Sequence, residues 1–276
     1  MMDCLQNHDY YALGITLAEL ITRTEYSIAE GAFQDDRGTI MSKEITGLAF
    51  TMWSDALPHC AKVLRQRANA PDSSKDLNDL ADILDIKYRI IKQRIPDAIS
   101  IATKALERNP NCAYFYYPMS LGSDTVSGLR AAKKGMKCSN ITPFVKFQLM
   151  YRAVEHSVER GIHNLTTEQL ERAGKAEEGI AFLTSAFEDA KTYIAEAPPD
   201  AFNMKNVCYW YVILFFVIKG PEATVDSYQI KVRLASEREV LLISNIAVHA
   251  KQAQDCRRHP YSLRNPSVQN KPTPHL

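Results

Sequence analysis

The chain has 276 residues and a net charge of +1, and 46% of its residues are apolar. This composition allows a large packed core, whereas the balanced charge gives no basic footprint for nucleic acid or for a strongly anionic membrane. Only 11 glycines and 13 prolines are present. That is low for an all-β protein with many tight turns, so we expect an all-α protein.

The six cysteines are each separated by more than twenty residues, so the chain contains no C-x-x-C pair. A zinc finger or a redox motif is therefore not expected. The N-terminal stretch "MMDCLQNHDYY" lacks the basic segment followed by an apolar stretch that is typical of a signal peptide. We expect reduced thiols and a cytoplasmic or nuclear location.

The first predicted helix runs from Tyr10 to about Phe33, and "QDDRGT" follows it. Residues 1–41 are thus interpreted as an N-terminal helix and loop. Apolar residues recur at helical spacing from Ser42 to about Asn69. Within this stretch, Pro58 is expected near the start of a second helix, where its missing N–H costs little.

A helix is predicted over Leu77–Gln93, and "DAISIATKALERNP" begins the next one. Ala98, Ala102 and Ala105 are spaced i, i+4, i+7, which places small residues on one narrow stripe. Small residues there let another helix approach closely. Asn109-Pro110 is expected to end this helix.

The same design recurs 33 positions later. The three alanines correspond to Ala131, Gly135 and Cys138, and Pro110 corresponds to Pro143. In the preceding helix, Ala81 corresponds to Tyr114. The turn "GSDTVSG" lies within this second pair, and its Asp124 is available as a helix cap. An upstream stretch from Asp55, "DALPHCAKVL", resembles "DAISIATKAL" as well.

These residues resemble the tetratricopeptide repeat, whose second helix carries small residues at three such positions and whose unit closes with proline. The match to the family's first helix is poorer, because its Trp, Leu-Gly and Tyr set is absent. The resemblance implies antiparallel helix pairs that form an α–α superhelix over residues 42–143. An irregular all-helical domain is the alternative.

Helical patterns continue over residues 144–256, which we expect to pack on the repeats as long C-terminal capping helices. Helices are predicted over Phe144–Gly161, Glu168–Ala197, Asn203–Lys219 and Val225–Gln254. The third contains "VCYWYVILFFVI" (Val207–Ile218), twelve residues that as a helix span about 18 Å, well short of the roughly 30 Å hydrocarbon layer. We interpret it as a buried helix, with a membrane-interacting segment as the alternative.

The tail, residues 257–276, holds four prolines, four Lys/Arg residues and no acidic residue. This composition predicts a disordered basic segment, with a docking role as the alternative.

No catalytic signature is found, so we expect no enzyme activity and no cofactor. His156, Glu159 and His163 fall on one face if the helix continues past Gly161, and imidazole and carboxylate groups can bind a metal. We expect instead that Gly161 frays the helix and that these residues form a solvated polar face. The glycines of "SLGSDTVSG" join two helices rather than following a strand, so a repeat turn is favoured over a phosphate-binding loop.

The predicted function is a non-catalytic scaffold that binds a peptide or helix of a partner protein in a helical groove. In the tetratricopeptide family, the first helix of each unit lines the groove. By that resemblance Lys87, Tyr116 and Ser120 would point inward; ordinary helix positions are the alternative reading. Two other functions remain open. The chain could be the helical portion of a MYND- or SET-type enzyme, or it could hold a small molecule beneath Tyr209, Trp210 and Tyr211.

Overall fold

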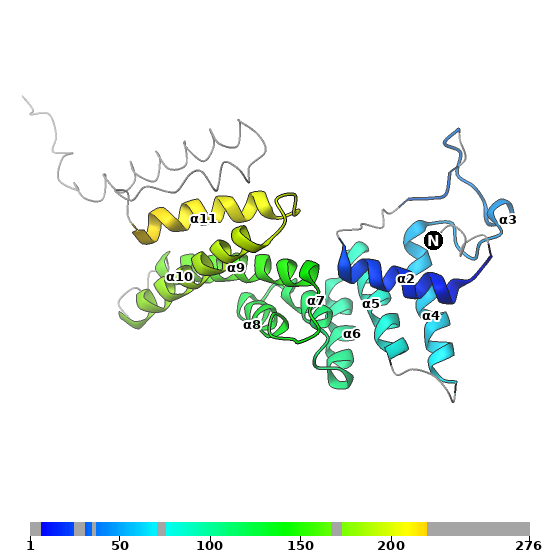
Figure 1. Ribbon diagram of the computed structural model, residues 1–276, viewed down its shortest axis with the longest axis horizontal. Coiled ribbons are helices and arrows are strands. Elements are labelled where there is room, and N and C mark those ends of the chain that lie inside the picture. The colour runs from blue at the N-terminus through cyan, green and yellow to red at the C-terminus, as the bar shows by residue number, and fades with distance from the viewer. Residues whose placement is uncertain (1–6, 25–30, 35–36, 71–75, 167–172, 220–276) are drawn as a thin grey trace, which may run out of the picture. The chain divides into compact units, whose positions relative to one another are not determined.

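The computed structural model describes residues 7–24, 31–34, 37–70, 76–166 and 173–219. These ranges consist of helices joined by loops, with two isolated β-bridges and no strand (Figure 1). The predicted all-α class is therefore confirmed. The helices are α2 (Tyr10–Arg23), α3 (Lys43–Thr46), α4 (Ala56–Ala68), α5 (Asp76–Ile91), α6 (Ile95–Arg108), α7 (Tyr116–Ser120), α8 (Thr125–Gly135), α9 (Pro143–Thr166), α10 (Ala173–Glu196) and α11 (Met204–Lys219), with 3₁₀ turns η1 (Trp53–Asp55) and η2 (Ala113–Phe115).

The chain divides into a unit of residues 1–210 and a unit of residues 211–276. The described part of the second unit, residues 211–219, is the C-terminal half of α11. No helix in the described ranges is both long enough and apolar enough to cross a membrane. The predicted helix Val225–Gln254 and the predicted disordered tail lie outside the described residues.

The N-terminal region differs from the prediction. Helix α2 ends at Arg23 rather than at Phe33, and Phe33 instead lies in extended backbone whose N–H donates to the Thr51 carbonyl. The helical pattern predicted from Ser42 begins with only a four-residue helix, since α3 ends at Thr46. Gly47 follows with φ of 66°, a left-handed conformation that stops a helix. Pro58 does lie in the first turn of α4, as predicted.

Helices α5 and α6 form the first pair, and their small-residue stripe is buried as predicted. Ala98, Ala102 and Ala105 are each 0% exposed. Pro96 lies in the first turn of α6, and α6 ends at Arg108, directly before Asn109-Pro110. The alanine spacing therefore correctly identifies the face of α6 that packs inward.

The second pair keeps the buried stripe of small residues but has a shorter first helix. Ala131, Gly135 and Cys138 are buried, and Asp124 caps α8 by accepting hydrogen bonds from the Val126 and Ser127 amides. In place of a long first helix, the chain forms η2 followed by the five-residue α7. A Cβ atom at Gly135 would lie 2.8 Å from Tyr116 Cβ, so the small residue permits the close approach of α7 and α8.

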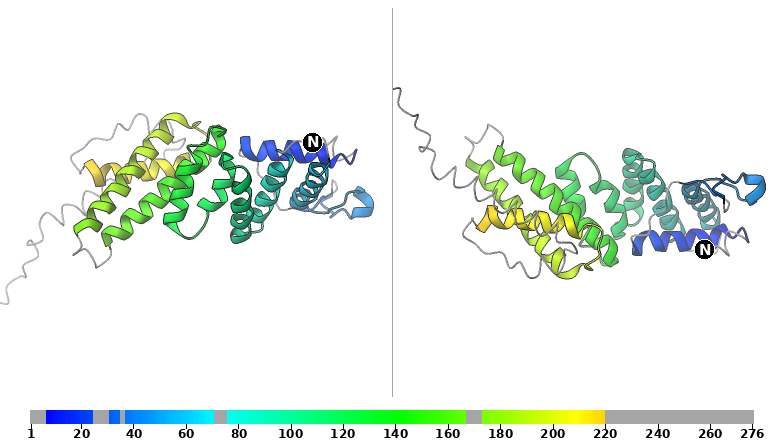
Figure 2. Two further views of the ribbon diagram at one scale, coloured as in Figure 1. Left: turned by 90° about the horizontal axis from the view of Figure 1, so that it is seen from below. Right: turned by 90° about the horizontal axis from the view of Figure 1, so that it is seen from above.

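Within the first unit, the helices from α4 to α10 pack in chain order, each on the next (Figure 1). Helix α2 departs from this order, because it lies against α4 and α5 and also contacts α9. Both turned views show α2 running along one side of the α4 and α5 helices (Figure 2). The Thr142 hydroxyl, just before α9, donates to the Thr22 carbonyl in the last turn of α2.

Helix α9 continues through Gly161 to Thr166, so the predicted fraying at this glycine is wrong. A Cβ atom at position 161 would lie 2.6 Å from Leu183 Cδ2 and 3.0 Å from the Gly179 carbonyl oxygen. Gly161 therefore serves the close packing of α9 against α10. Tertiary contact outweighs the low helix propensity of glycine at this position.

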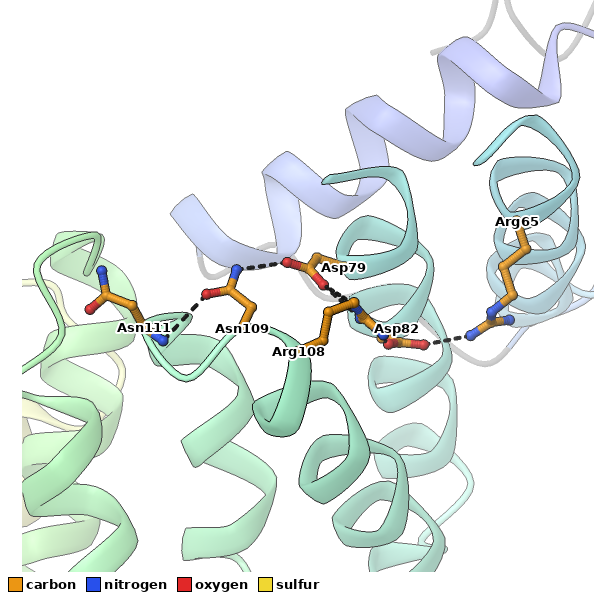
Figure 3. A network of polar contacts seen from close by, with 6 residues as sticks. All are labelled: Arg65, Asp79, Asp82, Arg108, Asn109 and Asn111. Carbon is orange, nitrogen blue, oxygen red and sulfur yellow. Dashed lines mark hydrogen bonds and ion pairs between the residues drawn. The ribbon is translucent and has the colours of Figure 1, made fainter. Parts of the chain in front are cut away.

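A polar network joins α4, α5 and the end of α6 (Figure 3). Arg108 Nη2 lies 2.6 Å from Asp79 Oδ1 and 2.6 Å from Asp82 Oδ2, and Arg65 Nη2 lies 2.7 Å from Asp82 Oδ1. The Asn109 amide donates to the other oxygen of Asp79 over 2.7 Å. Each carboxylate in this network accepts at least two hydrogen bonds from neighbouring elements, so the charges on this side of α5 are compensated.

Candidate functional site

The three residues predicted to face a groove occupy different environments. Lys87 on α5 lines a cavity of about 250 Å³. Tyr116 packs against α8, and its hydroxyl donates to the Pro110 carbonyl over 3.0 Å. Ser120 is 0% exposed, and its hydroxyl donates to the Tyr117 carbonyl over 2.6 Å. Its side chain therefore faces the interior rather than a groove, because the short α7 turns differently from α5.

The cavity beside Lys87 adjoins a second one of about 320 Å³, since Phe144 and Gln148 line both. We call the two together the α2–α9 groove. The Lys87 cavity is lined by Ile21, Lys87, Tyr114, Tyr117, Phe144, Val145, Gln148 and Phe202. The second cavity is lined by Arg23, Thr24, Pro143, Phe144, Phe147, Gln148, Pro198, Asp200 and Ala201.

Five segments that are distant in sequence build this groove: the end of α2, α5, the η2–α7 segment, the start of α9 and the loop before α11. The hydrogen bond from Thr142 to the Thr22 carbonyl holds the end of α2 beside the start of α9. The Asn203 amide donates to Gln148 Oε1 over 3.2 Å, which ties the loop before α11 to α9. The walls of the groove are thus positioned by packed helices.

Lys87 is a half-buried cation with no counter-ion. Within the described ranges it makes no hydrogen bond and no ion pair, and none of the described residues lining its cavity is acidic. Burial lowers the pKa of its amine below the usual value of 10.5, because desolvation disfavours the charged form. The contrast with the compensated carboxylates of α5 makes this lysine exceptional on its helix.

Tyr114 contributes a second polar group without a partner. Its side chain is 4% exposed, and its hydroxyl oxygen is buried with no hydrogen-bond partner in the described structure. Burial raises the pKa of this phenol well above 10, so it stays protonated and remains a donor. A buried hydroxyl without a partner costs about 1–3 kcal/mol. Such a group at a cavity wall is a candidate ligand contact.

Aromatic rings form most of the remaining wall of the Lys87 cavity. Tyr114 and Tyr117 lie with ring centroids 6.2 Å apart, and Phe144 lines the same space. Burial also raises the pKa of Tyr117. Phe202 lies at the edge with 78% of its surface exposed. The cavity therefore combines apolar walls with a small number of polar groups, an arrangement typical of binding pockets.

The histidine–glutamate set on α9 is not brought together. His156 is 3% exposed, and its Nε2 lies 2.7 Å from the Ser120 carbonyl oxygen, whereas Glu159 and His163 are exposed. The expected solvated face is therefore wrong for His156, because α8 covers it at Gly128. No group of three His, Cys, Asp or Glu residues in the described ranges could hold a metal ion.

Two further sequence candidates have structural explanations. Asp124 occupies the N-terminus of α8 with its own carboxylate, which leaves that terminus unsuited to a phosphate. Trp210 lines a cavity of about 710 Å³ between α8, α9 and the first half of α11. Two of its three acidic lining residues have partners, because Asp124 caps α8 and Glu155 pairs with Arg152, whereas Glu159 is exposed. Tyr209 is not among its lining residues.

No family model, no curated protein and no solved structure matches this chain.

The sequence predicts an inward orientation for Lys87, which lines a cavity in the structure, but it does not predict most of the other residues of the groove. Tyr114 was noted only as the counterpart of Ala81, a position that is buried in both pairs. The sequence does carry one signal for this residue. A tyrosine stands where the other pair has alanine, so its hydroxyl must extend beyond the space that an alanine side chain fills. The contribution of Ile21, Gln148 and Phe202 depends on long-range packing and gave no local signal.

Proposed function

We propose that the protein is a non-catalytic interaction scaffold that binds a segment of a partner protein in the α2–α9 groove. The single observation that carries this proposal is the convergence of five segments on two adjoining cavities with apolar walls. Two neighbouring cavities that share Phe144 and Gln148 suit a chain segment that places successive side chains in successive cavities.

The size of each cavity supports a protein partner over a large cofactor. The volume of about 250 Å³ lies below the range for small-molecule sites, which is about 300–1,000 Å³, and the volume of about 320 Å³ lies just inside its lower end. Such volumes suit individual side chains. The exposed ring of Phe202 at the edge of the groove adds apolar surface that a partner would cover.

We also propose that the helix pairs are tetratricopeptide-like. The buried small-residue stripes of α6 and α8 and the packing of the helices in chain order support this arrangement. A preformed helical surface would bind at little ordering cost to the scaffold itself.

Site-specific photo-crosslinking tests the location of the interaction. A benzoylphenylalanine at Phe202 is expected to yield discrete protein adducts in cells. The same probe at Ile180, which is 56% exposed on α10, serves as the control and is expected to yield none of them. Gln148→Arg, which fills the groove from the partly exposed surface of α9, should abolish the adducts without changing the circular dichroism spectrum. Identical adducts from both positions, or adducts that persist in Gln148→Arg, would contradict the proposal.

A further inference from the structure

We infer that Lys87 and Tyr114 form a subsite for a carboxylate, supplied by an Asp or Glu side chain of the bound segment that stands beside a large apolar residue. This inference rests on the proposed function and specifies the chemistry of the partner.

No acidic residue of the described ranges lines the Lys87 cavity, so the charge of the lysine is not balanced there. Lys87 lies about 140° around the helix axis from Asp82, and Asp79 lies about 80° around the axis and about 12 Å along it. Neither carboxylate lines the Lys87 cavity. Asp200 lines the second cavity, together with Arg23, and does not line the first. An incoming carboxylate would supply the missing counter-charge, and a desolvated ion pair of this kind is worth more than an exposed one.

The Tyr114 hydroxyl is an independent indication of the same ligand. It belongs to a different segment, η2, and Tyr114 lines the cavity, while its hydroxyl oxygen is closed to solvent and lacks a partner. Contact with a ligand therefore requires the phenol to turn toward the cavity. A phenol that stays protonated donates to an acceptor, and an ammonium group also only donates. A ligand that accepts from both must carry lone pairs and no competing positive charge, which describes a carboxylate oxygen.

The apolar neighbour follows from the second cavity. Phe144 and Gln148 are shared by both cavities, so a segment that places its acid beside Lys87 continues directly into the adjoining space. That space is lined by Phe147, Pro143 and Pro198 as well. A large aliphatic or aromatic side chain would bury its surface there.

The test uses the full chain and random dodecapeptides displayed on phage. Enriched peptides are synthesised, and their affinities are measured by fluorescence anisotropy. We expect an Asp or Glu beside a large apolar residue in the enriched set. Replacing that acid with its amide should weaken binding to the wild-type chain about tenfold or more.

Three variants locate the subsite. Lys87→Met and Tyr114→Phe each remove one donor, and Gln148→Glu adds a competing carboxylate of nearly the same shape to the cavity wall. Each should weaken the acidic peptide about tenfold, and Lys87→Met should remove the preference for the acid over its amide. Lys104→Met on the exposed side of α6 and Tyr116→Phe on the α8 side of α7 are the matched controls, and both should bind normally.

The outcomes separate the two proposals. Peptides that bind without an acid, or an acid preference that survives in Lys87→Met, would overturn the carboxylate subsite and leave the scaffold intact. Binding lost equally in the control variants would also overturn the subsite. Failure to enrich any peptide over an unrelated helical protein would overturn the scaffold and, with it, the subsite. Thermal unfolding of each variant excludes misfolding as the cause of lost binding.

Discussion

The charged residues on two sides of helix α5 differ in whether they have partners of opposite charge. Asp79 and Asp82 meet arginines of α4 and α6 at 2.6–2.8 Å, and Asn109 donates to Asp79 (Figure 3). Asp85 lies 2.6 Å from Arg65 Nη1. Lys87, on another side of the same helix, faces a cavity with no described acidic residue. Compensated charges hold helices together, whereas an uncompensated charge in a cavity lowers stability and is available to a ligand. The contrast thus separates the structural side of α5 from the side proposed to bind a partner.

The largest expected effect on stability comes from removing a carboxylate whose charge is compensated on α5. Asp79→Ala should lower the free energy of unfolding by about 2 kcal/mol, because it leaves Arg108 and Asn109 without their shared acceptor in a site where Asp79 is 13% exposed. Urea titration measures the change. Asp97→Ala is the control, since its pair with Arg94 is exposed and should contribute less than about 0.5 kcal/mol. Equal losses in both variants would contradict the comparison.

A change of opposite sign in the free energy of unfolding is expected where a polar group without a partner is removed from the Lys87 cavity. Tyr114→Phe should raise the free energy of unfolding by about 1 kcal/mol, because it removes a buried hydroxyl without a partner. Tyr116→Phe should lower it by up to about 1 kcal/mol, because its hydroxyl donates to the Pro110 carbonyl. Paired urea titrations check both signs. A loss of stability in Tyr114→Phe would show that the hydroxyl has a partner in solution.

A smaller gain with a defined pH dependence is expected for Lys87→Met. The pKa of Lys87 is lower in the folded chain than the ordinary value of 10.5, so the folded state holds fewer protons than the unfolded state between these two pKa values. Wild-type stability therefore rises with pH across this window. Lys87→Met should be more stable by up to about 1 kcal/mol at neutral pH, and its advantage should vanish above pH 10.5.

Urea titrations of both chains at several pH values measure this advantage. Burial raises the pKa of Cys112 to about 11 and that of Tyr151 to about 12, but both groups are present in both chains, so their effects cancel in the difference. An advantage that stays constant across the window would contradict the desolvation of Lys87.

The smallest effect comes from giving Lys87 an internal partner. Gln148→Glu keeps an oxygen for the Asn203 amide and adds a negative charge to the same cavity. It should raise stability by about 0.5 kcal/mol at low ionic strength, and the gain should shrink at high salt as the pair is screened. Thermal unfolding at two salt concentrations measures it, and the same variant of a Lys87→Met chain should show no gain.

The sequence predicted the helical class and the inward faces of α6 and α8, because the positions of small residues follow the helical period. Ala102 at 0% and Ala131 at 4% exposure confirm that prediction. It failed where a single backbone conformation or a distant contact decides the structure. Gly47 ends α3 through a positive φ that local periodicity does not register. Gly161 permits the contact with Leu183 and α10, which a helix-breaking interpretation overlooks.

The site was less predictable than the fold for a physical reason. Lys87 was identified from the expected orientation of a repeat helix, but Ser120 was misplaced because α7 is short and turns its residues inward. The polar character of the cavity depends on which groups lack partners. That property belongs to the complete tertiary structure and not to any one segment.

The contact between Thr22 and Thr142 has a consequence for synthesis on the ribosome. Ile21 is translated early, whereas Phe202 on the same cavity wall is translated some 180 residues later. At about 5–20 residues per second, Phe202 is synthesised on the order of ten seconds or more after Ile21. Helices α4 and α5 pack on α2 and are complete by Ile91, so they cover its apolar side early in synthesis. The groove beside Ile21 is completed only when Phe202 emerges, so a nascent chain cannot bind a partner there before that point.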